Sequence, residues 1–584
     1  MRLAPFTALL SAVLLLSWSS TSTAALPWAR SKAVPFDIVI RNGTVYDGSG
    51  GAPFVGDVAI RGDRIVAVGK KLRGPRLTEI DATGLAVSPG FINMLSWATE
   101  SLLADGRGLS DLKQGVTLEV MGEGSSMGPW NEKMRRQELA RQGDIKFDIS
   151  WTTLDGYLSH LETLGIAQNV ASFVGAETVR TNILGEEDVD PTPAELARMR
   201  ALVVQAMEEG ALGVGSSLIY APGSYADTDE LVALSTEAGR CGGMYISHMR
   251  SEGNRLLEAI DELIDISRRS GAPAEIYHLK AAGKQNWAKL DAAIARIEAA
   301  RAGGLRITAN MYTYTAGSTG LDAAMPTWVQ AGGREAWIRR LKDPATRRDV
   351  IAEMRVDSPA FENLYRFAGP EGTLLVGFQN PKLKPLTGKT LAEVAKMRGV
   401  SPEDAAIDLV IEDGSRVQVI YFLMSEENVR KETALPWMSF GSDAAALAPE
   451  GVFLQSSTHP RAYGNVARLL GKYVREERSL TLQEAVRRLS ALPAHNLGLH
   501  DRGMLKAGNF ADVVIFDPAT IADTATYESP KQFATGVRWV LVNGGVALKE
   551  GEPTALATGR VVRGRGWKGW PDGGCRASAK DWTW

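Results

Sequence analysis

The chain has 584 residues, of which 45% are hydrophobic and 23% are charged, and its formal net charge is −3. This composition is ordinary for a soluble globular protein. It excludes a strongly basic nucleic-acid-binding protein, because 65 Lys and Arg residues are balanced by 68 Asp and Glu residues. The length exceeds that of a typical single core, so one large domain and a smaller one are expected.

Residues 1–24 have the pattern of a secretory signal peptide. Arg2 supplies a positive charge, residues 9–16 form an apolar run, and residues 22–24 offer small side chains for cleavage. The apolar run is too short to span a bilayer, and no cysteine near the cleavage point could carry a lipid. The sequence therefore predicts an exported protein, periplasmic or secreted, without a membrane anchor.

Both ends of the remaining chain are rich in short β-type runs. In residues 36–88 these runs are separated by Asn-Gly, Gly-Gly and Gly-Asp turns, which is the pattern of β-hairpins. A similar pattern of short β-type runs is present over residues 499–562. We therefore predict one small β-sandwich built from both chain ends, followed by an irregular tail at residues 563–584.

Residues 89–498 alternate strand-like and helix-like segments. Eight strands alternating with helices is the count of a (β/α)8 barrel, so the predicted fold class is α/β, a TIM-like barrel with a small β-sandwich. A long connection, residues 322–436, mixes both patterns and is expected to be an inserted lid or pocket wall. The predicted strands are Phe91–Leu95, Val116–Gly122, Asn169–Gly175, Ala211–Ser217, Met244–His248, Ala274–His278, Leu305–Tyr312 and Trp437–Asp443.

The chain has two cysteines, Cys241 and Cys575. Two cysteines in an exported protein can form one disulfide. Their wide separation and the irregular sequence around Cys575 leave both a disulfide and two free thiols open.

Three predicted strand ends carry strong functional groups: His248, His278 and Asp443. Residues at the C-terminal ends of barrel strands line the active face. Two imidazoles and a carboxylate there are the composition of a catalytic zinc site in which the aspartate acts as base. A single buried histidine is more often satisfied by a backbone carbonyl. Two of the six histidines in the chain at equivalent strand ends favour metal ligands.

Seven stretches follow one another in a characteristic order between about Asp37 and Arg563. They are EEGALGVGSSLIYAPGSYADTDELVAL, ISHMRSEG, YHLKAAG, NMYTYTAGSTGL, FGSDA, HPRAYGNVARLLG and ADVVIFDP. Together they resemble the N-acyl-D-amino-acid deacylase (D-aminoacylase) branch of the metal-dependent amidohydrolase superfamily. The resemblance covers nearly the whole mature chain.

This resemblance implies a zinc hydrolase with the barrel and split β-sandwich described above. It implies that His248 and His278 bind the zinc and that Asp443 is the general base. It also implies a set of polar residues that hold the α-carboxylate of the substrate. All of them are present in this chain: Tyr220, Lys280, Tyr312, Ser318 and Arg461.

The chain also departs from the family pattern. The His-x-His of the first strand is replaced by LSW at residues 95–97, and the aspartate before it by Asn93. The Asn-Cys-Gly that carries a cysteine ligand is shortened to GEG at 122–124, and a Gly-His-Gly becomes GAE at 175–177. The missing first-strand histidines remove the accessory metal position of a two-metal framework and leave the ligands expected for the other metal. The leucine and tryptophan of LSW are then expected as apolar walls of the vacated space.

We predict that Glu123 takes the place of the lost cysteine. Two histidines and a glutamate form an established three-ligand zinc site with one position open for water. Glu177 is a rival, Glu119 lies on the same strand face as Glu123, and a solvated turn glutamate is the alternative to any ligand role. The expected cofactor is one Zn²⁺, although a glutamate ligand also admits another divalent metal such as Mn or Co.

The sequence therefore predicts an exported, single-metal amidohydrolase that cleaves N-acyl amino acids into a carboxylic acid and a free amino acid. A D-configured substrate is implied only by the resemblance. One alternative is a hydrolase of another amide, such as a dipeptide, lactam or cyclic imide; another is a non-catalytic binding protein that inherited the pocket. The acyl group, the amino-acid side chain and the oligomeric state are not determined by the sequence.

Overall fold

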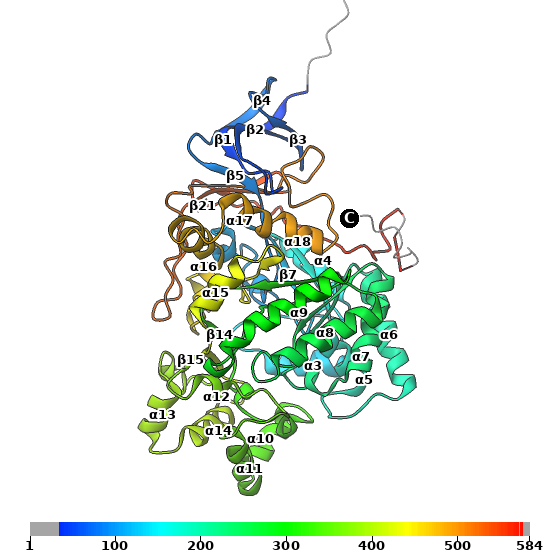
Figure 1. The fold of residues 1–584 in the computed structure, drawn as a ribbon, viewed down its shortest axis with the longest axis vertical. Helices are drawn as coiled ribbons and strands as arrows, with labels where there is room; N and C mark the ends of the chain where they lie inside the picture. Colours follow the sequence, from blue (N-terminus) through cyan, green and yellow to red (C-terminus); the bar gives the residue numbers. More distant parts are fainter. Residues whose placement is uncertain (1–33, 572, 576–584) are drawn as a thin grey trace, which may run out of the picture.

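The computed structural model of the chain describes residues 34–571 and 573–575. The predicted signal peptide and the end of the predicted tail lie outside the described residues. Figure 1 shows a β-rich domain at one end of the molecule, a strand-and-helix body in the middle and a mainly helical insertion at the other end. Within the described ranges, no helix is both long and apolar enough to cross a bilayer.

The body is a barrel of eight parallel strands. Its strands are β6 (Phe91–Asn93), β7 (Val116–Met121), β8 and β9 (Asn169–Ser172 and Val174–Gly175, one strand interrupted at a single residue), β10 (Gly213–Ser217), β11 (Met244–His248), β12 (Ala274–Ile276), β13 (Ile307–Met311) and β17 (Met438–Phe440). Neighbours pair in parallel in chain order. Met94 N donates to Phe440 O (3.1 Å) and Asp443 N to Leu95 O (2.9 Å), which joins the last strand to the first. All eight predicted strands are present, and the predicted fold class is confirmed.

Helices surround the barrel strands. They are α1 (Ser101–Ala104), α2 (Leu109–Leu112), α3 (Glu132–Arg141), α4 (Leu154–Leu164), α5 (Ala176–Leu184), α6 (Pro193–Glu208), α7 (Thr228–Arg240), α8 (Leu256–Ser270), α9 (Leu290–Ala302), α16 (Arg461–Arg468), α17 (Leu482–Leu489) and α18 (Ala491–Asn496). Their limits follow from local sequence. Thr192 and Glu195 form a capping box at the start of α6, with Pro193 in its first turn. Helix α8 ends at Gly271, which takes a left-handed conformation (φ 72°).

The interior of the barrel is apolar. Side chains such as Ile92, Leu118, Phe173 and Ile246 come from different strands and form one buried cluster. This packed core supports the opposite, C-terminal ends of the strands, where polar side chains collect.

The β domain joins both chain ends, as predicted. Its strands are β1 (Phe36–Val45), β2 (Phe54–Arg61), β3 (Arg64–Gly69), β4 (Arg76–Asp81), β5 (Ala86–Pro89), β18 (Val513–Phe516), β19 (Val537–Val542), β20 (Gly545–Lys549) and β21 (Glu552–Pro553). They form one nine-stranded network that branches at β1, which pairs with β2, β4 and β5. Antiparallel pairing of β5 with β18 connects the two ends. Their inward side chains share one hydrophobic core.

The insertion has a core of its own. Its elements are β14 (Ala316–Gly320), α10 (Arg334–Lys342), α11 (Pro344–Met354), α12 (Leu364–Ala368), β15 (Thr373–Gly377), α13 (Leu391–Arg398), α14 (Pro402–Asp413), β16 (Gln418–Phe422) and α15 (Glu426–Thr433). Strand β14 precedes the predicted start at residue 322 but belongs to the same small antiparallel sheet, in the order β14-β16-β15. The insertion therefore begins directly after the barrel strand β13.

The described part of the tail lies on the side of the barrel away from the polar strand ends. Its backbone bonds to residues near the starts of β8 and β10: Val562 N donates to Val170 O (2.8 Å) and Gly564 N to Gly210 O (2.8 Å). Cys575 forms a disulfide with Cys241, which follows α7. The cysteine pairing that the sequence left open is therefore present, and it holds the tail against the barrel.

Candidate metal centre and active site

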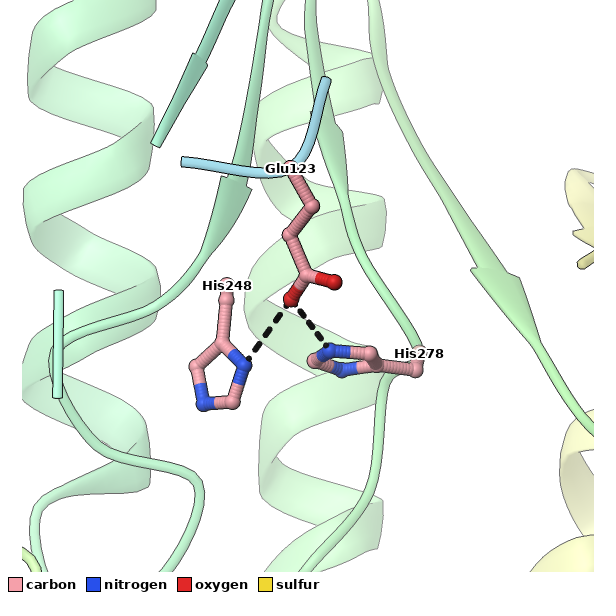
Figure 2. A group of neighbouring side chains, drawn as sticks. All are labelled: Glu123, His248 and His278. Atoms are coloured by element: carbon pink, nitrogen blue, oxygen red, sulfur yellow. Dashed lines mark hydrogen bonds and ion pairs between the residues drawn. The ribbon is translucent and has the colours of Figure 1, made fainter. Parts of the chain in front are cut away.

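Three side chains that can bind a metal meet at the C-terminal end of the barrel (Figure 2). Glu123 follows β7, His248 ends β11 and His278 follows β12. Glu123 Oε1 lies 3.1 Å from His248 Nδ1 and 3.0 Å from His278 Nε2, and all three residues are buried. Among the described residues, this is the one group of three or more His, Cys, Asp or Glu side chains whose ligand atoms lie within 4.8 Å of one another. The structure thus brings together the three predicted ligands.

The geometry and charge of this group fit a divalent metal. Ligand atoms of a tetrahedral zinc site are roughly 3.3–3.5 Å apart, so the present spacing needs to widen by only a few tenths of an ångström. Burial acts to raise the pKa of Glu123, but the charges of His278 and His248 hold it below its ordinary value. Burial and Lys280 act to lower the pKa of His278, yet the charges of Glu252 and Glu123 raise it to about 9. The negative charges of Glu123 and Glu252 therefore favour a positive charge at the two imidazoles, which a bound metal ion would supply.

The backbone around Glu123 directs its carboxylate into the site. Gly122 and Gly124 both have positive φ (105° and 66°), and a Cβ on Gly122 would lie 2.4 Å from the carbonyl oxygen of Phe173. Trp97 Nε1 donates a hydrogen bond to Glu123 Oε2 (2.9 Å). Trp97 was expected to be only an apolar wall. Its indole in fact occupies one carboxylate oxygen and leaves Oε1 facing both histidines.

Glu252 is a site residue that the sequence analysis missed. Its Oε1 lies 2.9 Å from His278 Nδ1 and 2.5 Å from Lys280 Nζ, and its Oε2 lies 3.6 Å from His248 Nε2. Burial acts to raise the pKa of Glu252, but Lys280 and the two imidazoles lower it below its ordinary value. A carboxylate on the far nitrogen of a ligand histidine fixes the tautomer and the ring orientation. The available signal was the position of Glu252 four residues after His248.

The insertion holds the loop that carries Glu252. The carboxylate of Glu362, which lies between α11 and α12, accepts hydrogen bonds from Ser251 Oγ and from the backbone N–H groups of Glu252 (2.9 Å) and Gly253 (3.1 Å). Burial and the charge of Glu252 raise the pKa of Glu362 to about 7. A contact outside the barrel thus helps to place the groups behind the two histidines.

Asp443, the predicted base, lies beside this group after β17. Its backbone N–H donates to Leu95 O, and its Oδ2 lies 2.8 Å from Arg461 Nη1. Burial raises the pKa of Asp443, while the Arg461 cation acts in the opposite direction. Asp443 Oδ1 has no hydrogen-bonding partner among the described residues, so one oxygen of the carboxylate is available.

The five predicted substrate-binding residues line the same cavity of about 440 Å³ as the predicted ligands and base. The Arg461 guanidinium lies over the ring of Tyr312, 4.4 Å from its centre. Ser318 lies on β14, where its hydroxyl donates to Val419 O (2.9 Å). The predicted residues in this one cavity are Glu123, Tyr220, His248, His278, Lys280, Tyr312, Ser318, Asp443 and Arg461. Lys280 lines the cavity but already contacts Glu252.

The rival carboxylates, Glu119 and Glu177, do not belong to the three-ligand group. Glu119 is fully buried and accepts a hydrogen bond from Asn93 Nδ2 (2.9 Å), away from the histidines. Glu177 lines the cavity but does not belong to the three-residue group. His459 Nε2 donates to Ala316 O (3.0 Å) and its Nδ1 accepts from Arg461 N (2.9 Å), so it shapes the loop before α16.

Comparison with known proteins agrees with this site. Residues 78–547 match the amidohydrolase family. The D-aminoacylase of Alcaligenes xylosoxydans xylosoxydans is 32% identical over 538 residues, which are 91% of this chain and 99% of that protein. The chain belongs to the amidohydrolase family, in its D-aminoacylase branch. The predicted family and the predicted class, a hydrolase of carbon–nitrogen bonds of the aminoacylase kind, are confirmed.

Two solved structures bear on the metal. The N-acyl-D-glutamate deacylase of Bordetella bronchiseptica, solved with zinc and a phosphonate that mimics the tetrahedral intermediate, is 28% identical with a TM-score of 0.75. A D-aminoacylase structure, described in terms of a binuclear metal centre with one-metal activation and second-metal attenuation, is 30% identical with a TM-score of 0.75. Both matches cover 91% of this chain and 100% of the other.

Proposed function

We propose that this protein hydrolyses the amide bond of N-acyl-D-amino acids with one divalent metal, releasing a carboxylic acid and a free amino acid. The observation that carries the proposal is the shared cavity. It holds a three-ligand group, a carboxylate with one free oxygen and an arginine able to bind a substrate carboxylate. The related enzymes named above support the substrate class, including its D-configuration.

Glu123, His248 and His278 would hold the metal. When bound, it supplies a Lewis acid that polarises the amide carbonyl and makes a water molecule more acidic. Glu252 holds the far nitrogen of His278 and fixes the orientation of that ring. Trp97 keeps the second oxygen of Glu123 away from the histidines.

Asp443 acts as general base and then as general acid. Its Oδ2 is held by Arg461, so Oδ1 takes the proton of the attacking water and later passes it to the departing amine. The raised pKa of the buried Asp443 suits both halves of this proton transfer.

Arg461 binds the α-carboxylate of the substrate. It is buried and fixed over the Tyr312 ring, and a substrate carboxylate would form a charge-assisted pair with the guanidinium. Tyr220, Tyr312 and Ser318 line the same cavity and would add hydrogen bonds. Lys280 adds positive potential.

A single zinc ion is the cofactor that we propose. LSW at residues 95–97 offers no histidine at the end of β6, which supports one metal position. The zinc-bound deacylase and the one-metal activation of the related D-aminoacylase support the same assignment. Manganese or cobalt is the alternative for a site with a carboxylate ligand.

Export is a further part of the proposal, supported by the pattern of residues 1–24. We expect a mature protein that has lost this segment. N-terminal sequencing of the protein recovered from the periplasm or medium checks this, and an intact N-terminus would contradict it.

The test of the activity combines metal analysis with a substrate panel. We expect about one metal per chain, and turnover of N-acyl-D-amino acids rather than lactams or cyclic imides. Asp443→Asn should abolish turnover while retaining metal, whereas Asp261→Asn on the exposed face of α8 should leave both unchanged. A metal-free active enzyme, or full activity in Asp443→Asn, would contradict the mechanism.

A further inference from the structure

The active-site cavity adjoins a second cavity on the Glu123 side. The second cavity has a volume of about 290 Å³ and shares Trp97, Ser125 and Glu177 with the first. We call it the acidic annex because of its ionisable lining residues, which are Glu100, Glu138, Arg141, Glu177 and Glu186.

The annex carries more negative than positive charge. Its guanidinium, Arg141, is already paired with Glu186 (2.9 Å) and with Glu335 outside the annex (3.2 Å). Within the described part of the chain, no cation lies within ion-pair distance of Glu100 or Glu138. Burial and the neighbouring Glu138 raise the pKa of Glu100 to about 7, as expected for a carboxyl group that lacks a counter-charge.

Glu177 is the one annex carboxylate that also lines the active-site cavity. Burial and the charge of Glu123 raise its pKa above the ordinary value. Its Oε1 is buried without a hydrogen-bond partner. Two glycines make room for it: a Cβ on Gly124 or Gly223 would lie 2.6 or 2.3 Å from Oε1. Glu177 is the last residue of GAE and lies in the first turn of α5.

Arg416 does not neutralise Glu177. This arginine is the cation whose charge acts on Glu177, but no ion pair forms between them. Its Nε instead binds Asp322 Oδ2 (2.8 Å), and its Nη2 binds Thr319 Oγ1 (3.2 Å). Glu177 is therefore a carboxylate beside the metal group without a cation of its own.

The substrate orientation in the proposed function places the acyl group on this side. The α-carboxylate lies at Arg461, next to Asp443, and the scissile carbonyl lies at the group formed by Glu123 and the two histidines. Beyond Glu123 the cavity continues to Glu177 and the annex. A neutral alkyl chain there would leave the buried carboxyl group of Glu177 without a counter-charge, whereas a cation would stabilise its ionised form.

We propose that the acyl group of the preferred substrate carries a protonated amine that pairs with Glu177. The substrate is then an aminoacyl amino acid, a dipeptide with a free amino terminus. This inference rests on the proposed function. One water is consumed, the amide C–N bond breaks, the acyl carbon becomes a carboxylate and the second amino acid leaves as its amine. The paired ammonium takes no part in the proton transfers.

The experiment compares four acyl groups on one D-amino acid, three of them (4-aminobutyryl, pentanoyl and succinyl) of similar length. Glycyl, 4-aminobutyryl, pentanoyl and succinyl derivatives present a near ammonium, a distant ammonium, no charge and a carboxylate. We expect kcat/KM for the better of the two amines to exceed that of the pentanoyl derivative by on the order of tenfold or more. Glu177→Gln should remove this preference while the pentanoyl derivative is still hydrolysed. Glu177→Gly is a second variant if the first fails to fold, and Glu162→Gln on the exposed side of α4 is the control.

The outcomes separate the two proposals. Hydrolysis of the pentanoyl or succinyl derivative at least as well as both amines overturns the aminoacyl inference and leaves the deacylase function standing. A preference for amines that survives in both Glu177 variants overturns the role of Glu177. The absence of turnover of all four derivatives, tested on several D-amino acids, overturns the proposed function and the inference with it. A preference for the 4-aminobutyryl derivative over the glycyl derivative would overturn the dipeptide assignment and support pairing of a more distant amine with Glu177.

Discussion

The two halves of the metal centre are built differently. At the ends of β11 and β12 the chain places His248 and His278, and both rings lie against the carboxylate of Glu252. After β6 it places a buried leucine and the partly exposed Trp97, whose indole binds Glu123. One half supplies nitrogen ligands, and the other supplies a carboxylate together with its hydrogen-bond donor.

If the proposed single metal is correct, this difference explains how a barrel loses one metal position and keeps another. Leu95, after the first strand, still accepts the backbone hydrogen bond of Asp443 and so supports the proposed base. Trp97 orients Glu123, so the residues that replaced the histidines serve the remaining position. In the proposed one-metal site, the half without histidines therefore has a role, and each half can be tested in turn.

The largest effect is expected at Glu123. Glu123→Gln removes the negative charge between the two histidines, and we expect loss of bound metal and a fall in kcat on the order of a thousandfold or more. Elemental analysis after dialysis and steady-state kinetics measure both. Glu177→Gln is the matched control, because Glu177 lies in the same cavity outside the ligand group and should leave the metal content unchanged. The opposite pattern would make Glu177 the ligand.

A smaller effect is expected in the histidine half. Glu252→Gln removes the charge that faces His278 Nδ1, and changes of this kind cost about 10–100-fold in metal affinity or activity. Titration with a competing chelator measures the affinity. Glu258→Gln, an exposed change on α8, serves as the control. An unchanged affinity in Glu252→Gln would mean that the histidines are oriented by other groups.

The parts of the site that the sequence could predict are those carried by strand periodicity. His248 and His278 end apolar runs, so the barrel register places them on one face, and the eight strands are found where predicted. Glu252 follows the end of β11 in a turn, where a glutamate is ordinarily solvated. Its burial depends on Lys280 and on Glu362 from the insertion, more than a hundred residues away.

The parts of the site and fold that the sequence did not predict depend on contacts between segments distant in the chain. Trp97 binds Glu123 because β6 and β7 are neighbours, and nothing in the LSW stretch specifies where the indole N–H points. The disulfide joins cysteines 334 residues apart, through a tail with no periodic pattern. Such contacts require the folded barrel, because no local spacing encodes them.

The next prediction concerns the pH dependence of Asp443. As a base, Asp443 must be ionised, so kcat falls as the pH drops through its pKa. Burial raises that pKa and Arg461 opposes the rise, so Arg461→Gln should move the acid limb of kcat to higher pH by roughly one to three units. The limb is read from kcat at saturating substrate, because the variant also weakens carboxylate binding. Arg339→Gln on α10 is the control, and an unmoved limb would remove Asp443 from the role of base.

The smallest effect is expected at Trp97. Trp97→Phe keeps the ring but removes the hydrogen bond to Glu123 Oε2 (2.9 Å). A hydrogen bond to a charged group is worth about 1.5–3 kcal/mol, but Trp97 is 38% exposed and water can replace the indole, so the expected loss falls below this range. We expect metal affinity and kcat/KM to fall by about three- to tenfold.

Trp328→Phe is a closely matched control for this change. Trp328 is 40% exposed, and its indole donates to Glu353 Oε1 (3.0 Å). Both residues belong to the insertion, and neither belongs to the ligand group. The Trp328→Phe variant loses an equivalent hydrogen bond, but to a glutamate outside the ligand group. Equal losses of metal affinity in the two variants would show that Trp97 acts only as packing. A loss confined to Trp97→Phe would tie the half without histidines to the metal position through Glu123.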